Sequence, residues 1–235
     1  MKKIFYIVFL LLTGFVFNSC KKTGGITPSN ASLTVVNGTI DVPNMALNFS
    51  PLGLPYAQNK TFISSASSFE MGVTAGVNTV NLLSSVDSST IYHSTINLTT
   101  SKIYSLYIAG QAPNYTTVLL EDNIPIYPDS AAGVRFINLS PDSQPLNVTL
   151  QGASGVVFST LAYKKITAFK KYTATSGIVN NGGYNFNVTD ASGNVLTTFN
   201  WIPMVFNESN TLVITGSYIN GSISVFQVNN FYTPN

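Results

Sequence analysis

The sequence predicts an all-β protein. Charged residues make up only 9% of the chain, against about 25% in typical soluble domains. Ser, Thr and Asn supply the polarity instead, and with abundant Val, Ile, Tyr and Phe they favour strands over helices. Short alternating or β-branched runs recur between turn signals, and no helical periodicity is sustained after residue 17. This even spacing is typical of a β-sandwich or barrel.

The first 19 residues have the features of a secretory signal peptide. Lys2 and Lys3 precede an apolar run over residues 4–17. This run is shorter than the roughly 20 residues that a transmembrane helix needs, whereas a basic start and a short apolar stretch are typical of an export signal. Cys20, the only cysteine, follows directly and resembles the lipobox cysteine of bacterial lipoproteins, which receives diacylglycerol.

We therefore expect a lipoprotein signal peptide over residues 1–19 and a lipidated Cys20 that begins a flexible tether over residues 20–30. Two or more acyl chains, such as palmitate, give stable anchoring where one is marginal. This predicts a lipid-anchored protein of the bacterial cell envelope, at the outer membrane. Lys21 and Lys22 match neither the aspartate nor the acidic run that sorts some lipoproteins, so the periplasmic and surface faces both stay open.

Charge and cysteine content exclude several classes of function. Without Lys2 and Lys3, the mature chain has 9 basic and 9 acidic residues. A near-neutral chain does not favour nucleic-acid binding, which needs clustered Lys and Arg. With Cys20 used by lipid, neither a disulfide nor a thiolate metal site can form.

Two blocks of the sequence repeat with an offset of 101 residues. Residues 31–41 and 132–142 both alternate into an apolar strand, reach an Asn and place an Asp four residues later. Weaker echoes continue to the chain end and predict two tandem domains, over residues 31–126 and 131–235. Pro125 and Pro128 stiffen the connector, which predicts a semi-rigid rod of two domains.

Each domain is expected to contain eight strands. Those of the first domain are predicted at residues 32–37, 45–50, 60–64, 69–74, 77–83, 91–98, 102–109 and 116–121. Those of the second are predicted at residues 133–138, 146–151, 156–160, 168–174, 184–189, 195–200, 211–218 and 222–228. Gly-bearing hairpin signals occur at residues 190–193 and 220–221.

The repeated blocks resemble the opening motif of the domain-of-unknown-function 4397 family. That motif is an apolar strand followed by Asn-Ala-Ser-Pro-Asp, and the second block keeps Asn138, Ser140, Pro141 and Asp142. Later family elements match residues 161–163, 183–188 and 120–123. The resemblance implies tandem immunoglobulin-like β-sandwich domains in a secreted or anchored bacterial protein. Because the family has no established biochemical role, it implies no catalytic residues.

No catalytic constellation is evident in the sequence. His93 is the only histidine and is expected to be structural. A histidine-built zinc site needs more than one histidine and is therefore not expected. Glu121 and Asp122 are adjacent, so they point to opposite faces of a strand. Asp41 and Asp142 are expected to accept hydrogen bonds from nearby backbone N–H groups. We expect no cofactor.

Three features are candidates for binding or modification. Four lysines, Lys164, Lys165, Lys170 and Lys171, could protect an edge strand or form a patch for an anionic ligand. Tyrosines could stack on a glycan, although aromatic residues more often pack in cores; they are Tyr92, Tyr104, Tyr107, Tyr115 and Tyr127. Ser130, in Asp-Ser-Ala, resembles an O-glycosylation acceptor of one group of Gram-negative bacteria. Trp201 is expected to anchor the core or the domain junction.

The sequence thus predicts a non-enzymatic envelope lipoprotein with a structural, adhesive or assembly role. The membrane, reached through the lipid anchor, is one partner, and an envelope protein or a glycan is a candidate second one. The alternative is a glycan-binding lipoprotein of a surface polysaccharide-uptake system. A hydrolase would need two carboxylates in one cleft.

Overall fold

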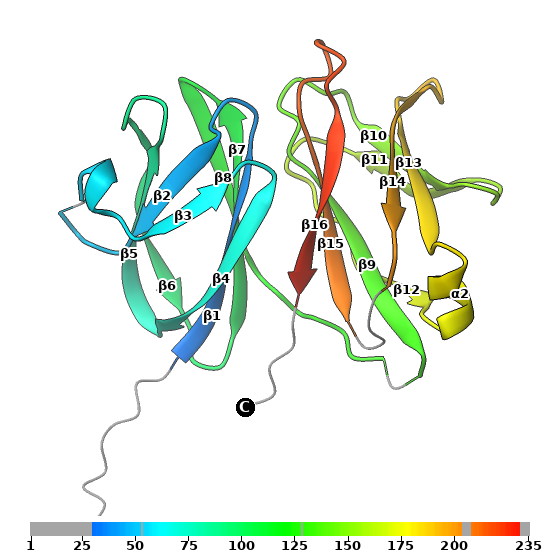
Figure 1. The fold of residues 1–235 in the computed structure, drawn as a ribbon, viewed down its shortest axis with the longest axis horizontal. Coiled ribbons are helices and arrows are strands. Elements are labelled where there is room, and N and C mark those ends of the chain that lie inside the picture. Colours follow the sequence, from blue (N-terminus) through cyan, green and yellow to red (C-terminus); the bar gives the residue numbers. More distant parts are fainter. Residues whose placement is uncertain (1–29, 53, 128, 204–207, 231–235) are drawn as a thin grey trace, which may run out of the picture.

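The computed structural model describes residues 30–52, 54–127, 129–203 and 208–230. The predicted signal peptide, Cys20 and the tether up to residue 29 lie outside the described residues. The chain enters its first strand at Asn30, the last residue of the predicted tether. Two β-sandwiches follow, over residues 30–121 and 131–230, and they stand side by side (Figure 1).

The first sandwich has two four-stranded sheets, in the orders β4-β1-β7-β8 and β3-β2-β5-β6. Its strands are β1 (Asn30–Thr39), β2 (Asn44–Asn48), β3 (Thr61–Ser64), β4 (Ser67–Thr74), β5 (Gly76–Ser84), β6 (Thr90–Leu98), β7 (Ile103–Gln111) and β8 (Asn114–Glu121). A short 3-10 helix, η1 (Tyr56–Gln58), lies in the connection from β2 to β3. β1 pairs with β7 in parallel and with β4 in antiparallel orientation.

The second sandwich repeats this strand order, as β12-β9-β15-β16 and β11-β10-β13-β14. Its strands are β9 (Ala131–Asn138), β10 (Leu146–Leu150), β11 (Val156–Leu161), β12 (Lys170–Thr173), β13 (Tyr184–Thr189), β14 (Val195–Trp201), β15 (Ser209–Thr215) and β16 (Ser224–Asn230). β9 and β15 form the matching parallel pair. A five-residue helix, α2 (Ser176–Asn180), was not predicted. The predicted all-β sandwich fold is confirmed.

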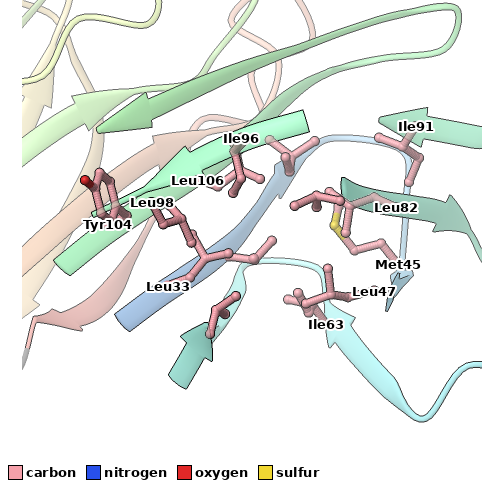
Figure 2. Packing of buried hydrophobic residues seen from close by; sticks show 14 of the residues in the cluster. Leu33, Met45, Leu47, Ile63, Leu82, Ile91, Ile96, Leu98, Tyr104 and Leu106 are labelled. Atoms are coloured by element: carbon pink, nitrogen blue, oxygen red, sulfur yellow. The ribbon is translucent and has the colours of Figure 1, made fainter. Parts of the chain in front are cut away.

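Each sandwich has its own apolar core. In the first, Leu33 and Leu106 of one sheet meet Met45 and Leu82 of the other, as Figure 2 shows. In the second, the fully buried Trp201 packs with other aromatic rings between the two sheets. The prediction that Trp201 anchors a core is therefore confirmed.

A third apolar cluster joins the two sandwiches. It contains Val36, Tyr107, Ala109, Ile137, Leu139, Val213 and Val228. These residues come from β1, β7, β15 and β16 and from the end of β9, so the sheets containing β1 and β9 are covered on both faces. The four sheets thus form four layers, with these two in the middle (Figure 1).

The two sandwiches share a buried face and pack side by side, instead of forming the predicted semi-rigid rod. Strands covered on both faces read as continuous apolar runs rather than as alternating ones, and Val35 and Val36 are consecutive and both fully buried. The second of these two side chains packs against the other sandwich, which fixes the domains beside each other. Within the described residues, no helix has the length and apolar character needed to cross a membrane.

Candidate functional site

The two motif asparagines hold equivalent turns. The Asn37 amide donates to the carbonyl oxygens of Val42 (3.1 Å) and Ile63 (3.3 Å). The Asn138 amide donates to the Leu161 carbonyl (2.9 Å). Both asparagines are fully buried, and each joins the turn after the first strand of its sandwich to the third strand. This structural role accounts for the Asn of the motif.

The two motif aspartates hold hairpins that lie far along the chain. Asp41 Oδ2 accepts hydrogen bonds from Ala112 N–H (2.7 Å) and Tyr115 Oη (3.2 Å). Burial and the neighbouring Asp41 carboxylate raise the pKa of Tyr115 to about 12. Asp142 accepts from Ser217 Oγ (2.5 Å) and Tyr218 N–H (2.7 Å).

The predicted acceptor role is therefore confirmed, but the predicted donors were wrong. The Ser140 hydroxyl donates to Asp142 Oδ1 (3.3 Å). The other donors are not nearby backbone groups but lie 71 to 77 residues further along, in the hairpin between the last two strands of each sandwich. For Asp142, burial opposes the charge, but the bonds from Ser217, Tyr218 and Ile219 outweigh it and lower the pKa of the carboxyl.

The hairpins that these aspartates hold line one groove between the sandwiches. Its volume is about 520 Å³, within the roughly 300–1,000 Å³ of ligand pockets. The first sandwich contributes Ile40, Gln111, Asn114 and Thr116, and the second contributes Pro141, Asp142, Tyr163, Ser217, Ile219 and Asn220. The hydroxyl oxygens of Thr116 and Tyr163 are buried and have no hydrogen-bond partner within the described residues. This groove is the candidate functional site.

The four predicted lysines are exposed but have separate surroundings. Lys164 and Lys165 lie in the turn after β11, where the Lys164 ammonium is 5.6 Å from the centre of the Tyr163 ring. Lys170 and Lys171 lie on β12, which is an edge strand. Lys170 donates to the Val157 carbonyl of the facing sheet. The position of this pair fits edge protection.

The tyrosines do not form a glycan-stacking platform, and the preferred alternative of core packing describes most of them. Tyr104 and Tyr107 are buried, and Tyr92 and Tyr115 pack against the core of the first sandwich. Tyr127, in the connector, is half-buried. These side chains therefore do not share one exposed face.

Ser130 and His93 are both exposed. Ser130 immediately precedes β9, where a modifying enzyme could reach it. His93 contacts the Asn81 side chain, which donates in turn to Asn48 Oδ1 (3.1 Å). This arrangement gives His93 the structural role expected of it.

Glu121 and Asp122 have different surroundings, but β8 ends at Glu121, so they are not on opposite faces of one continuing strand. Glu121 is exposed and pairs with Lys102 (2.8 Å). Asp122 is buried and pairs with Arg135, a residue that the sequence reasoning did not select. Within the described residues, no three His, Cys, Asp or Glu side chains gather as a metal site would require.

The fold and the groove define the class of this protein. It consists of two packed β-sandwiches, and the motif aspartate of each sandwich bonds to the hairpin that lines the groove between them. Residues 64–149 match the model of the family described as Domain of unknown function (DUF4397), which confirms the family resemblance. The matched segment begins at the end of β3 and ends in β10, so it crosses the junction between the sandwiches. It does not by itself show tandem family copies.

No curated protein matches the chain. Among solved structures, it is similar to a family CBM26 module of Eubacterium rectale Amy13K in complex with maltoheptaose, with 10% identity and a TM-score of 0.27, over 85% of this chain and 97% of that chain. The Bacillus anthracis TIE protein matches with 12% identity and a TM-score of 0.24, over 80% of this chain and 34% of that chain. A DUF3823 family protein from Bacteroides ovatus matches with 10% identity and a TM-score of 0.21, over 73% of this chain and 96% of that chain. Likenesses at this level carry no argument about function.

Proposed function

We propose that this protein is a non-enzymatic, lipid-anchored component of the bacterial cell envelope that acts by binding, in a structural, adhesive or assembly role. Cys20 carries the lipid, the following residues form the tether, and the two sandwiches are the working part. The outer membrane is the proposed location.

The observation that carries this proposal is the fixed placement of the two sandwiches. An apolar cluster and a buried ion pair join them, so the surfaces that both sandwiches contribute keep one geometry. Such a rigid body suits recognition, because little conformational freedom is lost on binding. The motif carboxylates also fit this role, since they accept hydrogen bonds from hairpins.

A glycan-binding role is the second candidate, and the groove favours it. Exposed amide side chains from both sandwiches meet there beside apolar side chains. Carbohydrate recognition uses groups of both kinds, because a sugar presents hydroxyls on its rim and C–H groups on its faces.

Labelling with radioactive palmitate tests the anchor. The wild-type chain should incorporate the label and sediment with membranes, whereas Cys20→Ser should lose both properties. The matched control is Ser19→Ala, which keeps a small residue before the cut and should still be labelled. An unlabelled wild-type chain would contradict the lipoprotein assignment. Release of reducing sugar from an oligosaccharide would contradict the non-enzymatic assignment.

A further inference from the structure

The walls of the interdomain groove are polar without being strongly charged. Three exposed amides line it, those of Gln111, Asn114 and Asn220. Each amide offers two N–H donors and a carbonyl acceptor. A sugar hydroxyl also both donates and accepts, so one amide can bond two neighbouring hydroxyls. Anionic or cationic ligands would instead call for unpaired charges of the opposite sign.

The charged groups at the groove do not provide such a site. Asp142 is the only Asp, Glu, Lys, Arg or His among its lining residues. The Ser217 hydroxyl and two backbone N–H groups already bond to its carboxylate. Its negative charge disfavours an anion, and the bonds to its oxygens leave it poorly placed to bind a cation. The nearby Lys164 ammonium lies over the Tyr163 ring. This balance favours a neutral ligand.

Two hydroxyls at the floor of the groove have no hydrogen-bond partner within the described residues. Thr116 Oγ1 comes from the first sandwich and Tyr163 Oη from the second, and both oxygens are buried. They are neighbours, and the Thr116 hydroxyl partly offsets the rise that burial causes in the pKa of Tyr163. A contact between them would use only one of the two O–H donors. A buried O–H donor without a partner destabilises the folded protein, and a ligand with several hydroxyls can supply that partner after a small shift of the ring.

Apolar side chains complete the lining. Ile219 is 77% exposed at the tip of the second hairpin, and Ile40 and Pro141 lie on the two sides of the groove. With the Tyr163 ring they offer C–H and ring surfaces between the amides. A pyranose ring has the matching alternation of C–H faces and hydroxyl edges.

The hairpins that form the walls are held in place before any ligand arrives. Asp41 and Asp142 bond to them, as described above. Gly110 and Gly216 occupy equivalent hairpin positions, and both have a φ of +93°, which only glycine adopts readily. A Cβ at Gly216 would collide with the Ser222 carbonyl. This pre-organisation reduces the entropy lost on binding.

We propose that the groove between the β7–β8 and β15–β16 hairpins binds a neutral saccharide. This inference rests on the proposed function as a binding protein and names the ligand class of its groove. Asn114 and Asn220 bond sugar hydroxyls from opposite walls, and Tyr163 supplies a ring surface and the floor hydroxyl.

Isothermal titration calorimetry of the full acylated chain tests the proposal. The detergent should be zwitterionic, because a sugar headgroup would compete for the groove. The probes are neutral oligosaccharides of glucose, mannose and N-acetylglucosamine, with oligogalacturonate as the anionic comparison. At least one neutral probe should bind more tightly than oligogalacturonate. Asn114→Ala and Asn220→Ala should each weaken that binding by about 3- to 10-fold, the effect of one lost hydrogen bond.

Two further variants make the test specific. Tyr163→Phe removes only the hydroxyl and should also weaken binding, whereas Asn97→Ala removes an exposed amide on β6, outside the groove, and should change nothing. Failure of every neutral probe, preference for the anionic probe, or equal binding by all variants would overturn the inference. Palmitate labelling of Cys20 does not depend on the groove. These outcomes would therefore overturn the saccharide site without contradicting the lipid anchor.

Discussion

Arg135 and Asp122 form a buried ion pair at the junction of the two sandwiches. Their side chains are only 5% and 0% exposed. Arg135 Nε also donates to Thr211 Oγ1 (2.8 Å), and Ser105 Oγ donates to the second Asp122 oxygen (2.5 Å). Asp122 directly follows β8 and Arg135 lies in β9, so the pair joins the end of one domain to the start of the next. Its hydrogen bonds compensate for part of the cost of burying two charges.

Arg135→Met should destabilise the protein by about 3–5 kcal/mol, because it leaves the Asp122 carboxylate buried without its partner. Urea unfolding followed by tryptophan fluorescence measures the change. The matched control is Lys102→Met, which removes an exposed pair with Glu121 and should leave the unfolding midpoint close to that of the wild type, because water screens exposed pairs.

The double variant Arg135→Met with Asp122→Leu should be more stable than the single Arg135 variant, since no unpaired charge remains. Equal losses in the single and double variants would show that packing rather than the charge pair stabilises this junction.

Asp142 should make stability depend on pH in the acid range. Its pKa in the folded protein lies below the ordinary value of 3.8, so the unfolded chain binds a proton more readily than the folded one. The stability that this carboxylate contributes is present above the unfolded pKa of 3.8 and is lost as the pH falls through the folded value. Asp142→Asn should therefore flatten the acid limb of a stability profile.

Glu208 provides a control of opposite sign. Burial raises its pKa above 4.5, so the unfolded chain loses this proton first and stability falls as the pH rises from 4.5 through the folded value. Glu208→Gln should therefore increase stability at pH 7 relative to the wild type. Thermal unfolding of all three proteins between about pH 3 and 7 checks both signs, and an unchanged acid limb in Asp142→Asn would contradict the role of that carboxylate.

Most of the fold could be predicted because turn signals and alternation are local. Every predicted strand overlaps an observed one. The helix α2 escaped because its five residues are too few to show a helical period. The side-by-side packing was available in principle: Val35 and Val36 interrupt the alternation, and Arg135 is a lone charge in an apolar run, two signs of a second covered face.

The groove could not be predicted in the same way. Gln111, Asn114 and Asn220 occupy hairpin positions where a polar residue needs no further explanation. Their meeting depends on how two domains pack, and periodicity within one strand does not contain that information. The motif gave a partial signal, since Asp41 and Asp142 stood at matching places, but it did not identify hairpins more than 70 residues away as their partners.

Gly38 should be required for the close approach of the two sandwiches. A Cβ at this position would lie 2.5 Å from Leu139 Cδ1 and 3.0 Å from the Ile108 carbonyl oxygen. Gly38→Ala should therefore cost about 1–3 kcal/mol through overpacking. Gly72→Ala is the matched control on β4, where no atom lies within 4 Å of the added carbon. Equal unfolding midpoints for both variants would show that Leu139 moves aside without cost.

Lys170 and Lys171 should protect the β12 edge against pairing with another chain. Both are exposed on an edge strand, and a lysine there places a charge against any strand that approaches. Replacing both with Thr, which keeps strand propensity, should increase light scattering on heating. Replacing Lys164 and Lys165 with Thr, in the turn outside the strand, is the matched control and should not. Binding to heparin and to anionic vesicles distinguishes the two interpretations of these lysines. If replacement of all four abolishes this binding while light scattering stays at the wild-type level, the lysines form a patch for an anionic ligand and do not protect the strand edge.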